Sequence, residues 1–265
     1  DPALVRTLTT HAKDAVAWLV SLGADLNTVG RAGGAKYPRA HRPTDGSAIG
    51  PEVIRVLWKA AKDRKMDVRT QTRATEIIMK DGRVAGVKAT TKDGKVYTID
   101  AKAVVLATGG FGANQDMLVK YQPKLKGYAT TNQPGATGDG IILAEHAGAA
   151  LVDMKQIQAH PTAAPDGTLI SESVRGDGGI LINAEGKRFT NELLTRDVVS
   201  AAELKQPGRF AWVFWDDATR KSAKLMDSYI SMGLAVKGNT VAEIAKAMNV
   251  PAAELEGTPK AYAAG

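Results

Sequence analysis

The segment from His160 to Asp197 concentrates residues that can bind or protonate an anion. It begins "HPTAAPDGTLISESVRGDGG", ends "NELLTRD" and holds few large apolar side chains. Histidine and arginine can bind a carboxylate, and glycine lets a ligand approach the backbone closely. The candidate residues of such a site, in chain order, are His160, Ser171, Glu172, Arg175 and Arg196.

Spacing alone supports only part of this chemistry. Glu172 and Arg175 are three residues apart and share one face if the segment is helical. An ordinary surface ion pair explains that spacing more simply, and it is the preferred interpretation from spacing alone. A lone histidine such as His160 is also more often structural than catalytic. Its importance therefore depends on the surrounding motif.

The elements that position these residues belong to a globular chain. With 265 residues and 44% hydrophobic content, the sequence can form one large domain or two ordinary ones. No apolar run approaches the roughly 18 to 20 residues of a membrane span, and the N-terminus lacks a signal-peptide layout, which indicates a soluble, mature or trimmed chain. The absence of cysteine excludes disulfides and thiolate sites. The net charge of +7 comes from scattered basic residues interleaved with acids, so no nucleic-acid partner is predicted.

Helical periodicity predicts two helices in the first third of the chain. Apolar residues from Leu4 to Leu19 form one stripe, and Gly23 ends the first helix. A second stripe of inward-facing residues runs from Ile49 to Ala61. The stretch Gly30 to Gly50 is too rich in glycine and proline for regular structure, so we expect an ordered or functional loop there.

Strand-like periodicity follows the second helix. Short runs are separated by Asp81-Gly82 and Asp93-Gly94, which are both hairpin signals, so the sequence predicts a three-stranded meander. The next run, Ala103 to Ala107, is apolar on both faces and is followed by a glycine pair. This pattern predicts a buried strand of a parallel sheet whose carboxyl end approaches a ligand.

A further helix is predicted to begin with Thr137 or Asp139 as its capping residue and to stop at Gly148. Two closing helices are predicted near residues 241–248 and 252–263. The composition shifts beyond about Met154 to the glycine-rich segment described above. We therefore expect two domains, residues 1–154 and 155–265.

Five motifs make the chain resemble the flavoprotein subunit of the fumarate reductase and succinate dehydrogenase family. They are "LATGGFGAN" (106–114), "TTNQPGATGDG" (130–140), "QAHPT" (158–162), "SESVRGDGGILINAEGKRFTNE" (171–192) and "TRD" (195–197). The resemblance runs from the Gly30 loop to about Ala263 and is nearest to the soluble branch, the flavocytochrome c fumarate reductases and their enoate-reducing relatives. It implies an α/β fold with an α+β cap: part of a Rossmann-like FAD-binding domain with a β-meander, plus a capping or clamp domain.

Two features of that family are absent from the sequence. Family members open with a strand and a G-x-G-x-x-G turn that binds the FAD pyrophosphate, and they end with a further histidine, arginine and glycine-rich segment. We therefore expect a middle piece, with a partial flavin domain in residues 1–154 and an incomplete cap in residues 155–265. In isolation it is expected to bind FAD poorly and to be inactive.

The resemblance implies a role for each candidate in the glycine-rich segment. Arg196 is the proton donor to substrate, and Glu172 and Arg175 form the relay that reprotonates it. His160 and Ser171 donate to a substrate carboxylate. Ser171 stands where the soluble fumarate reductases typically carry threonine, which keeps the hydroxyl in a slightly roomier pocket. Since the pKa of arginine lies above about 12, the alternative is that Arg196 only clamps a carboxylate.

The resemblance also implies FAD as the cofactor. The residues expected to contact it are Ala74, Ala107, Thr108, Gly109, Gly110, Thr131, Asn132, Gly138 and Asp139. From the residues themselves, only the glycines argue for such a contact. The histidines outside the motifs, His11, His41 and His146, have no second ligand at metal spacing, so no metal site is expected.

The implied activity is FAD-dependent reduction of the C=C bond of an unsaturated (di)carboxylate, of the fumarate to succinate type. Electrons are expected from a haem domain or another redox module outside this chain. One alternative is reduction of another 2-enoate, such as urocanate, acrylate or a cinnamate, and another is a non-catalytic fragment. Because the soluble relatives are often periplasmic, we expect a periplasmic location, with the cytoplasm as the alternative.

Overall fold

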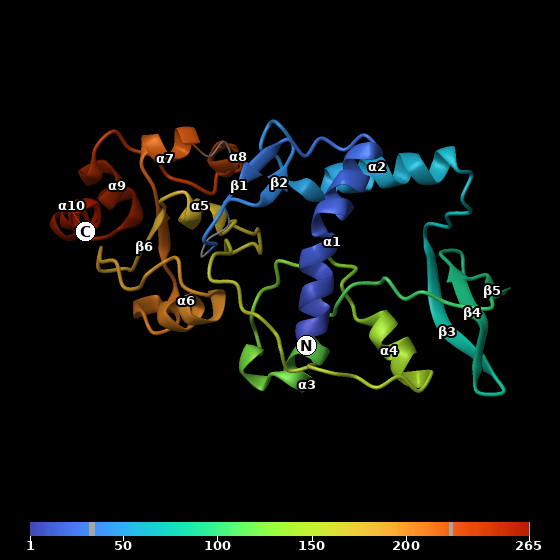
Figure 1. Ribbon diagram of the computed structural model, residues 1–265. Helices are drawn as coiled ribbons and strands as arrows, with labels where there is room; N and C mark the ends of the chain where they lie inside the picture. The colour runs from blue at the N-terminus through green and yellow to red at the C-terminus, as the bar shows by residue number, and fades with distance from the viewer. Residues whose placement is uncertain (32–34, 223–224, 265) are drawn as a thin grey trace. The chain divides into compact units, whose positions relative to one another are not determined.

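The computed structural model of this chain describes residues 1–31, 35–222 and 225–264 (Figure 1). These residues form two compact units. The first unit comprises residues 1–66, 159–164 and 169–265, and the second comprises residues 67–158 and 165–168. The sequence-based division into domains 1–154 and 155–265 stays a prediction.

The first unit begins with two helices and a short antiparallel strand pair. Helix α1 (Pro2–Ser21) and helix α2 (Ile49–Asp63) confirm the predicted helices. Strand β2 (Ala40–Arg42) lies in the stretch from Gly30 to Gly50 that was expected to lack regular structure, and it pairs with β1 (Thr28–Gly30). The expectation is therefore wrong for β2, and residues 32–34 of that stretch lie outside the described residues. The pairing supplies hydrogen-bond partners that a purely irregular loop would lack.

The core beside these helices contains Ala24, Leu26 and Val56. Val16 and Leu19 of α1 pack against it, and so does Leu57 of α2. The N-terminal half of the α1 stripe is exposed, with Leu4 70% and Leu8 71% accessible. Of the predicted stripe, only Val16 and Leu19 in its second half pack against this core, and both remain partly exposed.

The rest of the first unit is built from short elements. Strands β6 (Ile180–Ile182) and β7 (Trp212–Phe214) form an antiparallel pair. Ile180 and Ile182 share a core cluster with residues of the closing helices α9 (Val241–Met248) and α10 (Ala252–Ala264). Figure 1 shows β6 and these two helices near the C-terminus of the chain. Both closing helices were predicted and are confirmed. The remaining elements are α5 (Ser173–Gly176), α6 (Arg196–Glu203), the 3-10 turn η2 (Pro207–Arg209), α7 (Asp217–Ser222) and α8 (Leu225–Ser231).

The second unit contains the predicted meander. Strands β3 (Thr72–Lys80), β4 (Arg83–Thr91) and β5 (Val96–Asp100) pair antiparallel in that order. The turn between β3 and β4 places Asp81 at φ 52° and Gly82 at φ 74°, the left-handed conformation that a two-residue Asp-Gly hairpin requires. The hairpin signal in the sequence therefore located this turn correctly.

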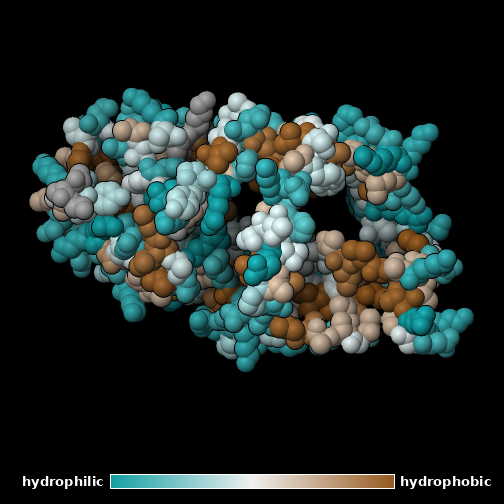
Figure 2. Space-filling model, viewed as in Figure 1, coloured by the Kyte–Doolittle hydropathy of each residue, from teal (hydrophilic) through white to brown (hydrophobic). Residues whose placement is uncertain are grey.

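The prediction of a buried strand from Ala103 to Ala107 is wrong for this structure. The segment has no strand pairing, and Val105 is 88% exposed. A buried parallel strand needs hydrogen-bonded neighbours on both edges, and no described strand pairs with this segment. Figure 2 shows apolar surface near the meander, where Val96 and Ile99 are also exposed.

Three short helical elements complete the second unit: α3 (Gln115–Tyr121), the 3-10 turn η1 (Pro123–Leu125) and α4 (Asp139–His146). The predicted helix before Gly148 is confirmed, but its capping residue is Gly138 rather than Thr137 or Asp139. The reason is that the Thr137 hydroxyl donates to the Asp139 carboxylate at 2.8 Å, while that carboxylate also accepts from Arg73 at 2.8 Å. Neither side chain is directed at the helix amides.

The mixture of helices and small antiparallel sheets agrees with the predicted mixed α and β fold class. None of the helices in the described ranges has the length and apolar character needed to span a bilayer.

Candidate active site

Glu172 is the central residue of a charged cluster in the first unit. Its Oε2 atom lies 3.3 Å from His160 Nε2, and its Oε1 atom accepts a hydrogen bond from Arg196 Nη2. The three residues come from different segments, 12 and 24 positions apart. Their side chains are 10% exposed for His160, 21% for Glu172 and 37% for Arg196, so the cluster is open to solvent mainly at Arg196.

These contacts determine the ionisation of Glu172. The hydrogen bond with His160, and then the one with Arg196, hold the pKa of the Glu172 carboxyl well below its usual range, although burial acts in the opposite direction. Glu172 is therefore a carboxylate at neutral pH. It can accept a proton only transiently, as a relay group does.

A short local pairing positions His160. The Thr162 hydroxyl donates to the Ile170 carbonyl at 2.6 Å, and the Ile170 amide donates to the Thr162 carbonyl at 3.1 Å. His160 Nδ1 lies 3.0 Å from the Thr162 carbonyl oxygen, so the ring is fixed at its second nitrogen as well. The pairing places His160 beside the turn that leads into Glu172.

Ser171 is fixed from a different direction. Its amide donates to the hydroxyl of Tyr229 at 2.9 Å, and its own hydroxyl accepts from the Ser173 amide at 3.2 Å. Tyr229 lies in α8, 58 positions away, and is only 5% exposed. Sequence analysis did not single out Tyr229, because a tyrosine on a helix carries no signal of the amide that it binds.

Arg175 is a buried residue rather than half of a surface ion pair. It is 3% exposed, and its Nη1 donates to the Glu192 carbonyl oxygen at 2.6 Å. Burial lowers the pKa of Arg175, and the negative charge of Glu172 acts in the opposite direction. The surface ion pair preferred from spacing alone is therefore wrong, since α5 turns Arg175 into the interior.

Glu192 is a second residue that sequence analysis missed. Its carboxylate accepts from the Leu181 amide at 2.9 Å and from Arg188 Nη2 at 2.7 Å, and the residue is 2% exposed. These bonds fix the backbone carbonyl that accepts from Arg175. The only signal in the sequence was the four-residue spacing of Arg188 and Glu192, which is common on protein surfaces.

The predicted cofactor residues lie together in the second unit. The Gly138 amide donates to the Gly110 carbonyl at 3.1 Å, which places the start of α4 next to the glycine pair. The ion pair of Arg73 and Asp139, at 2.8 Å, places β3, and with it Ala74, beside the same helix start. The "TTN" segment joins them because the Thr130 hydroxyl donates to the Gly112 carbonyl at 2.7 Å. Thr131 and Asn132 follow Thr130 directly.

The form of this cluster fits a bound flavin nucleotide. A Cβ atom added to Gly109 or Gly110 would meet nothing within 4 Å, so the backbone there is open to a close ligand. A Cβ added to Gly140 would lie 2.0 Å from the Thr108 hydroxyl, so this glycine is needed for packing instead. The Thr137 hydroxyl, and then Arg73, lower the pKa of Asp139, which keeps an ionised acceptor at the helix start. Ala107 lies exposed beside Thr108.

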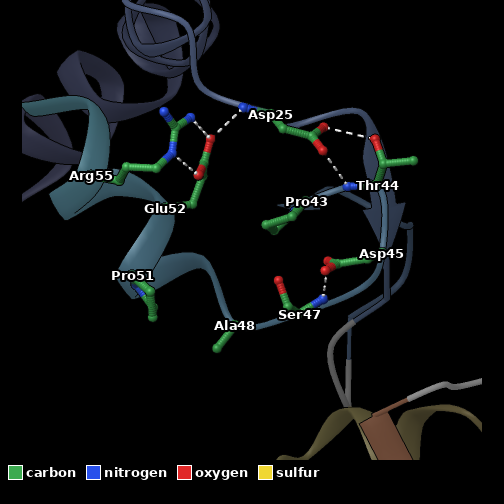
Figure 3. A pocket seen from close by; sticks show the side chains of 9 residues that line it. All are labelled: Asp25, Pro43, Thr44, Asp45, Ser47, Ala48, Pro51, Glu52 and Arg55. Carbon is green, nitrogen blue, oxygen red and sulfur yellow. Dashed lines mark hydrogen bonds and ion pairs between the residues drawn. The ribbon is translucent and has the colours of Figure 1, made fainter. Parts of the chain in front are cut away.

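A separate open hollow of about 780 Å³ lies in the first unit between the β2 end and α2 (Figure 3). None of its nine lining residues is a predicted site residue. Its polar groups bind one another: Asp25 accepts from the Thr44 amide at 2.9 Å, and Glu52 accepts from the Asp25 amide at 2.7 Å. Over residues 1–31, 35–222 and 225–264, no group of three histidines, aspartates or glutamates could hold a metal ion.

The chain is similar to several flavoenzymes. It is 46% identical, over 99% of its length and 46% of the relative, to a fumarate reductase (cytochrome) of Shewanella frigidimarina. It is 42% identical to an NADH:fumarate oxidoreductase of Klebsiella pneumoniae, over 94% of this chain and 27% of that protein. The open conformation of a flavocytochrome c3 fumarate reductase matches 93% of this chain and 44% of that chain, with a TM-score of 0.74 and 43% identity.

The chain thus spans less than half the length of these relatives. The family model described as "FAD binding domain" matches residues 1–228. This match includes every residue predicted to contact FAD and all five candidates of the glycine-rich segment. The predicted resemblance to the fumarate reductase flavoproteins and the predicted cofactor are confirmed, and the chain belongs to the FAD binding domain family.

Proposed function

We propose that this chain carries the substrate-binding and proton-donating residues of an FAD-dependent reductase that converts fumarate to succinate. The observation that supports this most directly is the Glu172 carboxylate, which binds His160 on one oxygen and Arg196 on the other. Such an arrangement combines an anion-binding group, a proton donor and a relay group within one cluster. The relatives named as fumarate reductases give independent support.

Reduction of an unsaturated acid requires a hydride at one alkene carbon, a proton at its neighbour and donors that polarise the carboxylate. Bound FAD supplies the hydride. Arg196 supplies the proton: one of its N–H bonds breaks as the new C–H bond forms. The pKa of arginine normally lies above about 12, so this step requires a strongly basic carbanion-like carbon beside it.

Glu172 and Arg175 return the proton to Arg196. The Arg196–Glu172 hydrogen bond gives a direct path for that transfer, and Glu172 is ionised and therefore able to accept a proton. Arg175 is buried and is acted on by the charge of Glu172. Burial lowers the pKa of Arg175, so it releases a proton more readily than an exposed arginine. Each transfer breaks one N–H or O–H bond and forms another, so the relay needs no further reactant than water.

His160 and Ser171 bind a carboxylate of the substrate. His160 is held at both ring nitrogens, and Ser171 is held at its amide and its hydroxyl, so both are ordered before substrate arrives. Ordered donors lose little entropy on binding. Two donors and a nearby arginine favour a dicarboxylate such as fumarate over a 2-enoate with one carboxylate, which is the alternative substrate class.

FAD is held by the cluster at the start of α4. In this proposal the open backbone of Gly109 and Gly110 would let the cofactor approach closely, and the ionised Asp139 would offer it a hydrogen-bond acceptor. Ala74, Ala107, Thr108, Thr131, Asn132 and Gly138 complete the contact. Since no G-x-G-x-x-G turn occurs in the sequence, we expect the 265-residue chain to bind FAD weakly, which a fluorescence titration measures. Tight stoichiometric binding would contradict this part of the proposal.

The electron donor is a haem domain or another redox module. One relative is named as a cytochrome and another as an NADH-dependent enzyme, so the family uses more than one donor. A periplasmic location goes with the haem donor and rests on the resemblance to the soluble branch. Cell fractionation, followed by haem and NADH assays of the fraction that holds the protein, decides between the two donors.

Because the isolated chain is expected to be inactive, the activity is tested by anaerobic oxidation of reduced viologen by a complete FAD-loaded enzyme that carries this chain. Fumarate should support turnover at a kcat/KM at least tenfold above that of urocanate, acrylate or a cinnamate. If one of those acids is turned over faster than fumarate, that acid replaces fumarate as the proposed substrate. An FAD-loaded protein that turns over none of them would support the remaining alternative, a non-catalytic ligand-binding fragment.

A further inference from the structure

Two buried polar atoms close to the proposed relay lack a hydrogen-bond partner. Among the described residues, three buried side-chain nitrogen or oxygen atoms have no partner, and two of them are Arg175 Nε and Glu203 Oε2. An unsatisfied buried donor or acceptor loses its hydration without compensation, so native proteins seldom retain one without a role. Arg175 Nε is a donor and Glu203 Oε2 is an acceptor, and the charge of Arg175 acts on Glu203. The two residues can therefore share a function.

Helix α6 explains how Glu203 comes to lie there. Arg196 is its first residue and Glu203 its last, so one helix carries the proposed proton donor at one end and this carboxyl at the other. Arg175 is the charged residue that acts on Glu203, and the Ala211 amide faces the same carboxylate. The charges of Glu172 and Glu203 both act on Arg175 in turn, as do those of Arg196 and Glu192, so Arg175 lies close to both carboxylates.

We propose that Glu203 is a positioning residue of the reductase, whose protonation state decides how readily Arg175 passes a proton to Glu172. This inference rests on the relay of the proposed function. When Glu203 is protonated, Arg175 loses one of the negative charges that stabilise its guanidinium, and the transfer is easier. When Glu203 is ionised, its charge holds the proton on Arg175. The exchanged proton comes from water, and no bond other than O–H or N–H is broken.

Glu203 titrates near neutral pH, so its charge can change Arg175 within the pH range of the test described below. Burial raises the pKa of Glu203 to about 7, against the opposing effects of the Ala211 amide and the Arg175 charge. The residue therefore changes charge between pH 6 and pH 8. Glu172 does not titrate in that range, since its pKa is held well below it by the hydrogen bonds to His160 and Arg196.

The test compares the pH profile of kcat for the wild type and Glu203→Gln in a complete FAD-loaded enzyme that carries this chain. Glutamine keeps the shape of the side chain but is always neutral. Wild-type kcat should fall severalfold from pH 6 to pH 8, with a solvent deuterium isotope effect that grows over the same range. Glu203→Gln should keep its pH 6 rate at pH 8 and so exceed the wild type there. A merely structural role would lower the rate at every pH, and would not produce this gain.

A matched control is Glu185→Gln, because Glu185 is an exposed residue of the same unit, paired with Lys187 at 3.8 Å. It should reproduce the wild-type profile. An unchanged midpoint in Glu203→Gln, or a wild-type kcat that is constant from pH 6 to pH 8, would overturn the proposal.

Carboxyl-carbon NMR of glutamate-labelled protein gives a second readout that does not depend on turnover. A signal that is lost in Glu203→Gln should titrate near pH 7, and a midpoint near 4.5 would overturn the proposal. If Arg196→Ala leaves kcat intact while that signal still titrates near pH 7, the relay itself fails and the assignment of Glu203 as the titrating carboxyl stands. The two failures are therefore distinguishable.

Discussion

Arg196 and Glu172 are joined by a hydrogen-bonded ion pair across 24 positions of sequence, from the first residue of α6 to the residue that precedes α5. The pair is part-buried, with 37% of Arg196 and 21% of Glu172 exposed. Arg196 can therefore reach a ligand while Glu172 stays behind it. Arg196 would therefore contact the substrate, and Glu172 would return a proton to Arg196.

In the complete enzyme, Arg196→Ala should lower kcat by about 100-fold or more with little change in KM or flavin content, because a proton donor acts in the transition state. Arg196→Lys should recover part of the rate, since lysine keeps the charge and can donate a proton. If Arg196 only clamps a carboxylate, alanine should mainly raise KM, and lysine should fail because it lacks the planar two-point fork. Steady-state kinetics with fumarate and reduced viologen separate the two roles.

Glu172→Gln should lower kcat by about 10- to 100-fold while substrate binding changes little, because glutamine keeps the contacts to His160 and Arg196 but cannot accept a proton. The comparison is Glu76→Gln, an exposed glutamate paired with Lys88 at 3.7 Å, which should keep the wild-type rate. If Glu172→Gln and Glu76→Gln have the same kcat, Glu172 is not part of the relay. Equilibrium binding of succinate, measured alongside, reports on the ground-state site.

Tyr229→Phe should reduce the free energy of unfolding by about 1–3 kcal/mol, because the Ser171 amide loses its acceptor in a buried position. The KM for fumarate should rise as Ser171 becomes less ordered. Tyr262→Phe is the control, since Tyr262 is 41% exposed and its ring, which the variant keeps, contacts Arg188. A Tyr229→Phe protein with unchanged stability and KM would show that this bond does not position Ser171.

Gly138→Ala should destabilise the start of α4. Gly138 has a φ of +77°, and an added Cβ would lie 2.6 Å from the Met117 sulfur and 2.8 Å from the Phe111 Cβ. Gly94→Ala shares the positive φ, +84°, but meets nothing within 4 Å, so it measures the cost of the backbone conformation alone. Alanine at 138 should cost more than the roughly 1 kcal/mol expected at 94. Urea denaturation of the two variants gives the difference.

Stability should depend on pH through Glu203. Its pKa is raised from 4.5 to about 7 on folding, so the folded state binds more protons between these values and stability falls as pH rises through that window. Glu203→Gln removes this loss and should be more stable than the wild type at pH 8, by at most about 3 kcal/mol, but not at pH 4. Denaturation of both proteins at pH 4 and pH 8 gives the difference in their free energies of unfolding. The same difference at both pH values would contradict the predicted dependence on Glu203.

Much of the fold follows from local sequence. The Asp81-Gly82 turn and the capped helix α1 depend on neighbouring residues alone, because backbone conformation at a hairpin or a helix end is decided within a few residues. The motif around His160 likewise predicted which residues gather with Glu172. The sequence also predicted a buried strand at Ala103–Ala107. Apolar composition indicates burial but does not identify the partner strands, and no strand in the described part of the chain pairs with this segment.

Composition and motifs by themselves determined the family, the cofactor and the names of the candidate residues. The tertiary structure decided which of them are buried and what they bind. Arg175 donates to the Glu192 carbonyl, and the Ser171 amide donates to the Tyr229 hydroxyl. Glu203, the last residue of α6, lies close enough to Arg175 for the two charges to interact. These relations join segments up to 58 positions apart, and no local preference encodes them. Burial and neighbouring charge, which set each pKa, exist only once those segments have packed.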